Sequence, residues 1–202
     1  NNLDLWIADT ESKTPFVIYI HGGGFGAGSK NAAYTKNNFK RVKRLLDNNI
    51  SFATIDYRFK NNDDFLLSSL NDAKRALQYL KFNNEKFNLI KNKVALMGAS
   101  AGATSSLWIG LQDDLSDKKS KDPVLRESTK VSCIVGMAAA HSLNLNRWKE
   151  MANVDEDYLK SIFEKYLGKM DTEKWMKRSF DKDYISEVDF FEKMDSNDPP
   201  IF

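Results

Sequence analysis

The segment Gly98-Ala99-Ser100-Ala101-Gly102 restricts the fold of this chain more than any other part of its sequence. It follows the apolar run Lys93–Met97, which is typical of a strand buried on both faces, and precedes a predicted helix over Ala103–Leu111. A direct passage from strand to helix needs a sharp turn, which small flanking residues permit, and this turn lifts the central side chain clear of the backbone. Taken alone, the segment is also compatible with a glycine-rich structural turn.

Strand and helix patterns alternate through the first two thirds of the chain. Runs that are apolar throughout predict buried strands, and apolar residues at helical spacing predict amphipathic helices. The predicted strands are Phe16–Ile20, Ile50–Tyr57, Lys93–Met97 and Val131–Met137, and the predicted helices are Tyr34–Asn48, Leu66–Phe82 and Ala103–Leu111. This order predicts an α/β fold with a mostly parallel sheet and helices on both faces.

The pattern changes after residue 142, where helical segments rich in aromatic residues replace the alternation. We predict that residues 1–142 form the N-terminal part of an α/β core, that residues 143–196 form a helical cap, and that residues 197–202 begin the next core strand. The aromatic residues of the cap either line a ligand pocket or pack the cap onto the sheet. Because a sheet should not stop at the first residues of a strand, we expect that these 202 residues lack the C-terminal part of the fold.

Composition excludes several classes of partner. Lys plus Arg number 30 and Asp plus Glu 28, so the net charge of +2 gives no electrostatic reason to expect nucleic acid or an anionic membrane as a partner. The sequence contains no run close to the roughly 20 apolar residues of a membrane span. The only cysteine, Cys133, excludes an intrachain disulfide framework. The chain starts at Asn1 without methionine, so a soluble protein of the cytoplasm and one secreted after loss of an upstream signal both stay open.

A second glycine-rich segment, His21-Gly22-Gly23-Gly24-Phe25, follows the strand Phe16–Ile20. Consecutive glycines let backbone N–H groups point into a cavity without obstruction by side chains. Donors placed in this way stabilise the oxyanion of a tetrahedral intermediate by about 3–4 kcal/mol each. Gly23 and Gly24 are the candidate oxyanion donors, and the N–H group of Ala101 is the third. A phosphate-binding loop and a flexible turn are the alternatives. Against a phosphate-binding loop, three glycines are adjacent here and the Lys-Ser/Thr ending of a P-loop is absent.

The two motifs, in this order, resemble the α/β-hydrolase serine esterases with an HGGG oxyanion motif. This grouping includes hormone-sensitive-lipase-like and carboxylesterase-type enzymes, and the chain is similar more narrowly to a feruloyl-esterase-like bacterial esterase/lipase group. Other segments that carry the resemblance are Leu3–Trp6, Asp56–Arg58, Asp122–Thr129 and Asp198–Pro200. The resemblance spans nearly the whole chain.

The resemblance implies that Ser100 is the catalytic nucleophile and cleaves a small-molecule carboxylic ester through an acyl-enzyme. It implies no cofactor and no metal. In such families the acid and the histidine of the triad follow in the order Ser…Asp…His. The strand that would precede the acid begins near Pro200, so we expect both residues beyond Phe202, on a companion C-terminal segment. A small or medium acyl group is favoured over a long lipid.

Two residues are candidates for lining the substrate pocket: Phe25, at the end of the glycine loop, and His141, at the carboxyl end of a predicted strand. His141 as the general base would break the chain order of the family, and a histidine that anchors the cap or belongs to a loop is favoured. His21 is expected to shape the glycine loop. The acidic cluster around Asp113 does not have the spacing of a calcium loop. Two other functions stay open, namely a non-catalytic binding protein on a hydrolase scaffold and a peptidase or thioesterase with the same machinery.

Overall fold

A mixed sheet of five strands in the order β1-β3-β2-β4-β5 forms the centre of the molecule. The structure is a computed structural model that describes residues 2–140, 142–167 and 171–202. Four strands are parallel, and β1 pairs with β3 in the antiparallel direction. The strands are β1 (Leu3–Trp6), β2 (Thr14–Ile20), β3 (Ser51–Ile55), β4 (Leu89–Ala99) and β5 (Cys133–Met137). The predicted α/β fold with a mostly parallel sheet is therefore confirmed.

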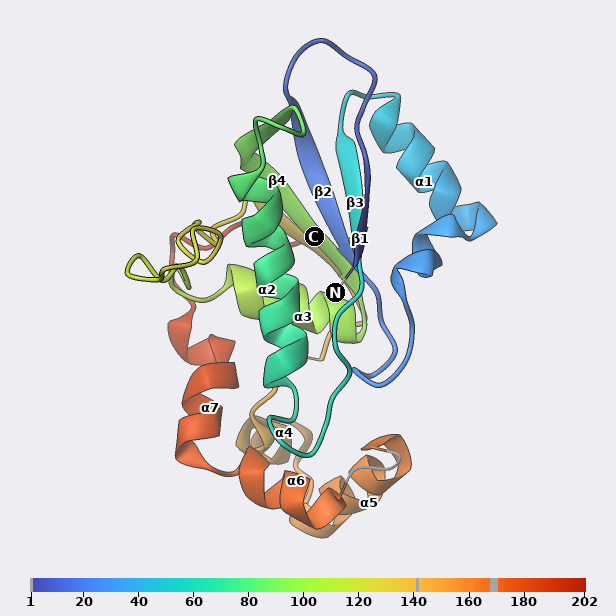
Figure 1. Cartoon of the computed structure of the whole chain (residues 1–202). Coiled ribbons are helices and arrows are strands. Elements are labelled where there is room, and N and C mark those ends of the chain that lie inside the picture. Colours follow the sequence, from blue (N-terminus) through green and yellow to red (C-terminus); the bar gives the residue numbers. More distant parts are fainter. Residues whose placement is uncertain (1, 141, 168–170) are drawn as a thin grey trace.

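Helices cover both faces of the sheet, as predicted, because the inner strands are apolar on both sides. The side chains of Phe16, Ile18 and Ile20 belong to the larger core cluster with α2 (Leu67–Phe82) and α3 (Ala101–Gly110). Val17, from the opposite face of β2, packs with Val42 of α1 (Lys36–Leu46). Figure 1 shows α1 on one side of the sheet and α2 on the other. The short 3₁₀ helix η1 (Lys30–Tyr34) precedes α1.

The strand β4 is longer than its sequence pattern indicates. The apolar pattern predicts only Lys93–Met97, whereas the strand runs over Leu89–Ala99. Its first half contains Lys91, Asn92 and Lys93, and these polar residues hide the strand from a hydropathy argument. Leu89 pairs with Thr14 ahead of a register shift in β2, so pairing with the neighbouring strand extends β4 where its own residues do not signal it.

The last residues of the chain lie along the outer edge of β5. The N–H of Ile134 donates to the carbonyl of Pro200 at 3.0 Å, and the N–H of Phe202 donates to the carbonyl of Ile134 at 2.9 Å. Ile134 and Ile201 form a parallel bridge. Cys133, on the same strand, is half-buried, and burial raises the pKa of its thiol.

The helices that follow β5 lie beyond the end of the sheet toward which the parallel strands run (Figure 1). They are α4 (Leu145–Ala152), α5 (Glu156–Leu167), α6 (Thr172–Ser179), α7 (Lys182–Val188) and the 3₁₀ helix η2 (Phe190–Lys193). The carboxylate of Asp189, which is 3% exposed, accepts hydrogen bonds from Asn144 and Arg147. This buried ion pair joins the start of α4 to η2, so the two ends of the helical segment are held together.

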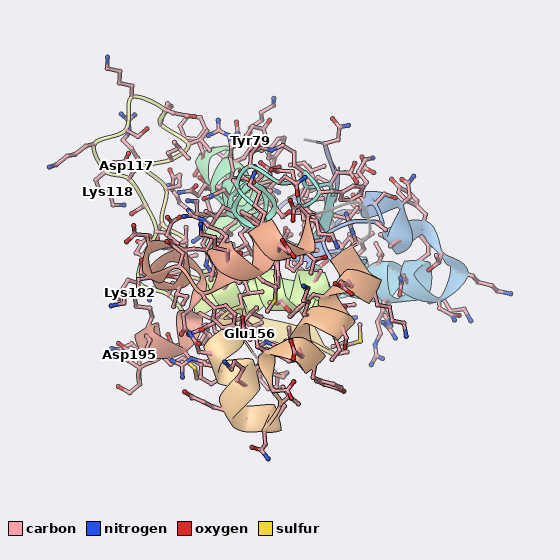
Figure 2. All side chains as sticks on the ribbon, turned by 90° about the horizontal axis from the view of Figure 1, so that it is seen from below. Tyr79, Asp117, Lys118, Glu156, Lys182 and Asp195 are labelled. Atoms are coloured by element: carbon pink, nitrogen blue, oxygen red, sulfur yellow. The ribbon has the colours of Figure 1, made fainter. Side chains whose placement is uncertain are left out.

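Charged side chains of both signs project from the periphery of the molecule (Figure 2). Lys118 in the loop after α3, Glu156 at the start of α5 and Lys182 at the start of α7 are exposed examples. Within the residues that the structure describes, no helix is both long and apolar enough to cross a membrane. The same residues hold no group of three or more His, Cys, Asp or Glu side chains that could bind a metal ion.

One buried cation gives a prediction about stability. Lys81, near the end of α2, is 1% exposed, and its ammonium donates to the carbonyl of Lys130 at 2.5 Å. Burial lowers the pKa of Lys81 from its ordinary value of 10.5 to about 8. Between these two values the unfolded chain binds more protons than the folded one, so the contribution of Lys81 to stability rises with pH over this range.

We expect Lys81→Met to remove this rise. Urea unfolding at about pH 7 and about pH 10 should show that the free energy of unfolding of the wild type increases relative to that of the variant. The difference between the two proteins cancels the contributions of other titrating groups. Equal changes in the two proteins would contradict a depressed pKa at Lys81.

Candidate active site

Ser100 occupies a strained turn between the end of β4 and the start of α3. Its backbone has φ of 50° and ψ of −120°, in a region that residues with a side chain rarely adopt. The N–H of Ser100 donates to the carbonyl of Met137 at 2.8 Å, and its carbonyl accepts from the N–H of Thr104 at 2.9 Å. Its side chain is exposed. The turn therefore presents an accessible hydroxyl at the carboxyl end of β4, an inner strand, where α/β sheets bind their ligands.

Two glycines allow the strands and the helix to meet at this turn. A Cβ atom on Gly98 would lie 2.3 Å from the carbonyl carbon of Gly102, and one on Gly102 would lie 2.0 Å from the carbonyl oxygen of Ile20. Both distances are far shorter than a van der Waals contact, so only glycine fits at either position. The small residues in the sequence pattern thus bring the start of α3 against the ends of β4 and β2.

The glycine loop after β2 packs directly against Ser100. A Cβ atom on Gly22 would lie 3.3 Å from the Cβ of Ser100 and 2.7 Å from the carbonyl oxygen of Ala99. Gly23 and Gly24, the next two residues, have φ angles of 116° and 58° and are exposed. The structure therefore brings the two sequence motifs together, although more than 70 residues separate them in the chain.

The proposed oxyanion donors have free hydrogen-bonding capacity. Within residues 2–140, 142–167 and 171–202, no acceptor is present for the backbone N–H groups of Gly23, Gly24 and Ala101. Ala101 begins α3, so its N–H is one of the donors that a helix leaves without an intrahelical partner. The partial positive charge of the helix N-terminus favours a negative charge at the same place. The arrangement is chemically suited to a hydroxyl nucleophile next to an anion-binding loop.

His21 and Tyr57 hold the glycine loop from its buried side. The two rings stack with centroids 4.2 Å apart, and the His21 side chain is 1% exposed. The Tyr57 hydroxyl donates to the carbonyl of His21 at 3.0 Å. Burial raises the pKa of Tyr57, so this hydroxyl stays protonated and remains a donor at neutral pH. The Nδ1 atom of His21 lies 2.7 Å from the carbonyl oxygen of Gly22, which engages the ring with its own loop.

The structure describes one of the two side chains that the sequence suggests as pocket-lining. Phe25 is 7% exposed, has φ of 58°, and packs in the hydrophobic core with its ring 6.2 Å from that of Tyr57. His141 lies outside the described residues. Among the residues that the structure describes, His21 is thus the only histidine, and its ring is committed to the glycine loop.

Two residues near the site escaped the sequence argument. Lys60 donates from its Nζ to the carbonyl of Gly24 at 3.2 Å, and its N–H donates to the carbonyl of Phe25 at 2.7 Å. The Oγ1 of Thr104 donates to the carbonyl of Ser100 at 3.2 Å and accepts from the N–H of Ala140 at 2.9 Å. Position 104 carries a weak signal, since it is one helical turn after Ser100. Position 60 carries none, because its partners precede it by 35 or more residues.

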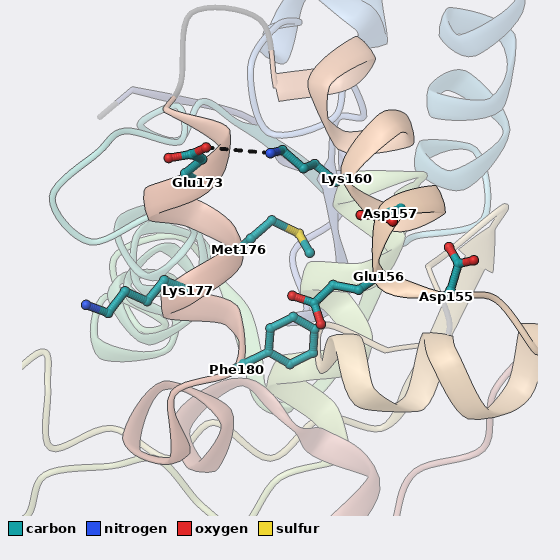
Figure 3. A pocket seen from close by; sticks show the side chains of 8 residues that line it. All are labelled: Asp155, Glu156, Asp157, Lys160, Glu173, Met176, Lys177 and Phe180. Carbon is teal, nitrogen blue, oxygen red and sulfur yellow. Dashed lines mark ion pairs between the residues drawn. The ribbon is translucent and has the colours of Figure 1, made fainter.

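A cavity of about 740 Å³ lies elsewhere, between the start of α5 and α6 (Figure 3). Its lining is mostly charged and consists of Asp155, Glu156, Asp157, Lys160, Glu173, Met176, Lys177 and Phe180. An ion pair between Lys160 and Glu173, with Nζ and carboxylate oxygen 3.6 Å apart, crosses it. Ser100 does not line this cavity, so the candidate site rests on the turn and the glycine loop and not on cavity volume.

Comparison with known proteins identifies one family model, BD-FAE, which matches residues 3–202. Among curated proteins, the chain is 30% identical to Gut esterase 1 of Caenorhabditis elegans over 132 residues, which are 61% of this chain and 23% of that protein. It is 34% identical to Esterase P of Drosophila melanogaster over 106 residues, which are 51% of this chain and 19% of that protein. The chain thus aligns with a quarter or less of each of these relatives.

Solved structures show the same fold. An acetyl ester-xyloside bifunctional hydrolase from Caldicellulosiruptor lactoaceticus is 29% identical, with a TM-score of 0.60, and the match covers 70% of this chain and 49% of that one. The esterase Est2 of Thermogutta terrifontis is 15% identical, with a TM-score of 0.67, and the match covers 100% of this chain and 64% of that one. The predicted resemblance to α/β-hydrolase serine esterases is therefore confirmed.

Proposed function

This chain belongs to the BD-FAE family, and on that premise we propose that it hydrolyses carboxylic esters through an acyl-enzyme on Ser100. The observation that carries the proposal is the exposed Ser100 side chain, held at a φ of 50° with the glycine loop packed against its Cβ. Strained backbone of this kind persists only where the surrounding structure enforces it, and it concentrates at functional sites. Esterases among the relatives support the same reaction class.

The mechanism follows from the groups around Ser100. The Ser100 oxygen attacks the ester carbonyl carbon while its proton passes to a general base, and the carbonyl oxygen becomes an oxyanion. The N–H groups of Gly23, Gly24 and Ala101 donate to this oxyanion. Collapse of the intermediate breaks the bond to the alcohol, which leaves with the proton from the base. Water then attacks the acyl-enzyme by the same route and releases the carboxylic acid.

The general base is assigned outside the described residues. His21 is buried, stacked on Tyr57 and bonded to Gly22, so it is not oriented toward Ser100 as a base. We assign the base and its carboxylate partner to a companion C-terminal segment, in the order Ser…Asp…His that the resembling esterases follow. Activity is therefore to be measured on the full-length protein.

We assign the helical segment 143–196 to a cap over the site. The cap aromatics Trp175 and Phe190 are 5% and 1% exposed, and the rings of Phe163 and Trp175 have centroids 4.3 Å apart. This burial supports the interpretation that these rings pack the cap onto the sheet, in preference to the alternative that they line an acyl pocket. A substrate with a small or medium acyl group fits the proposal, and the acetyl ester hydrolase among the similar structures directs attention to acetyl esters of carbohydrates.

The test is a substrate panel with the full-length protein. It should contain aryl acetate, butyrate and palmitate esters, acetylated xylan, methyl ferulate, an aryl thioester and a peptide anilide. We expect turnover of the short aryl esters and a phosphonate label on Ser100. The tryptic peptide that contains Ser100 also contains Ser105, Ser106 and Ser116, so fragment-ion mass spectrometry must place the label.

Three results would contradict the proposal. Faster turnover of the anilide or the thioester would move the protein to a peptidase or thioesterase class. If the protein neither turned over any substrate nor reacted with the phosphonate, it would be a binding protein on a hydrolase scaffold. A label on a serine other than Ser100 would remove the assigned nucleophile.

A further inference from the structure

One face of α3 joins the Ser100 turn to both ends of the helical segment that follows β5. Thr104 and Trp108 lie four residues apart on one side of α3, and Gln112 follows just after the helix ends at Gly110. Trp108 Nε1 donates to the carbonyl of Glu187 at 2.8 Å, and Gln112 Nε2 donates to the same carbonyl at 3.3 Å. These two bonds hold the returning end of the segment, at α7. Thr104 holds its outgoing end.

Thr104 makes a bridge that its neighbours do not make. Its side chain is fully buried, its Oγ1 accepts from the N–H of Ala140 at 2.9 Å, and the same hydroxyl donates to the carbonyl of Ser100 at 3.2 Å. The single hydroxyl proton and one lone pair are thus both used. Ser105 and Ser106 also donate back to the preceding helical turn, to Ala101 and Gly102, but they accept no hydrogen bond from another segment of the described chain.

Both polar backbone groups of Ser100 are consequently tied to the residues just after β5. The N–H of Ser100 bonds directly to Met137, and its carbonyl connects to Ala140 through the hydroxyl of Thr104. Between these two points Ala138 has φ of 52°, so the connecting loop also contains a residue in the left-handed region. A serine at a φ of 50° needs such external constraint to keep its side chain in one direction.

We propose that Thr104 is a positioning residue that fixes the backbone of Ser100, and hence the direction of its Oγ, by linking it to Ala140. This inference rests on the proposed function, in which Ser100 is the nucleophile. Thr104 itself touches no reacting atom. Its effect on the reaction is the orientation of Ser100 relative to the oxyanion donors, and misplacement of a nucleophile lowers the rate of attack more than the affinity for substrate.

The experiment compares three variants of the full-length protein. Thr104→Val keeps the shape of the side chain and removes the hydroxyl, Thr104→Ser restores it, and Ser106→Ala removes a buried hydroxyl that bonds only within the helix. We expect Thr104→Val to lower kcat on a short aryl ester by about tenfold or more while KM changes little. Thr104→Ser should recover most of the rate. Ser106→Ala should stay within about threefold of the wild type in kcat.

Amide hydrogen exchange separates this inference from the proposed function, because it needs no turnover. We expect Thr104→Val to speed exchange in peptides that contain Ser100 and Ala140, with little change in Ser106→Ala. Unchanged exchange at both positions would overturn the bridge, and a kcat loss of equal size in Thr104→Val and Ser106→Ala would overturn the positioning role. A wild type whose activity does not depend on Ser100 would instead refute the proposed function, and exchange would still decide whether Thr104 orders the turn.

Discussion

Replacing Ser100 by alanine is expected to lower kcat for ester hydrolysis by about 10⁴-fold or more, because no second nucleophile replaces the lost hydroxyl and the acyl-enzyme cannot form. The N–H groups of Gly23, Gly24 and Ala101 remain, so substrate binding and KM should change little. The variant should also lose its reaction with aryl phosphonates. Initial rates on an aryl acetate, measured together with phosphonate labelling, test both expectations.

A matched serine variant controls for damage to the protein. Ser116→Ala, in the loop after α3, removes a hydroxyl from the same tryptic peptide but leaves the turn unaltered. It should keep kcat within about threefold of the wild type. Thermal unfolding of both variants shows whether either has lost its fold. An Ser100→Ala protein that is folded and hydrolyses the ester at the wild-type rate would remove Ser100 from the mechanism.

The second large effect is expected at Gly23. Its φ is 116°, and an added Cβ would lie 2.1 Å from the carbonyl oxygen of Ala27, so Gly23→Ala forces the loop backbone to move. That movement turns the N–H groups of the loop away from the oxyanion position. Loss of one such donor costs about 10²–10³ in kcat. We expect a fall of this order in kcat, measured on a short aryl ester.

Gly24→Ala is the matched control, since it is the same substitution one residue later. A Cβ atom at Gly24 would have no atom within 4 Å, and its φ of 58° is a left-handed conformation that alanine adopts at a cost of about 1–2 kcal/mol. Its N–H is retained, so kcat should fall by less than about tenfold. Equal losses of kcat in the two alanine variants would show that the collision with Ala27 does not cause the loss in Gly23→Ala. Wild-type kcat in Gly23→Ala would remove Gly23 from the oxyanion site.

The sequence predicts a strand or helix correctly where the hydropathy of that element's own residues indicates it. The apolar runs at Phe16–Ile20 and Lys93–Met97 predict strands buried on both faces, and both lie at the centre of the sheet. The polar beginning of β4 was missed because its strand conformation comes from pairing with β2 and not from its own hydropathy. Strand pairing is a property of two segments, and a scan of one segment does not contain it.

The arrangement around Ser100 divides in the same way. The small residues at 98, 99, 101 and 102 are visible in the sequence because a tight approach of backbones admits only small side chains, and the Cβ positions at Gly98 and Gly102 show this approach. The sequence does not show that Tyr57 is the residue of Asp56–Arg58 that holds the glycine loop. Its hydroxyl reaches the carbonyl of His21, 36 residues earlier, and any strand-end tyrosine has the same local pattern.

The sequence by itself determined the α/β class, the turn at Ser100 and the three adjacent glycines, because each depends on side-chain size and hydropathy over a few consecutive residues. Only the tertiary structure decided that Gly22 packs against Ser100, that Phe25 turns into the core and that the hydroxyl of Thr104 joins Ser100 to Ala140. These outcomes depend on contacts and hydrogen bonds between distant segments. A pattern read along one segment does not show which residues of another segment will contact it.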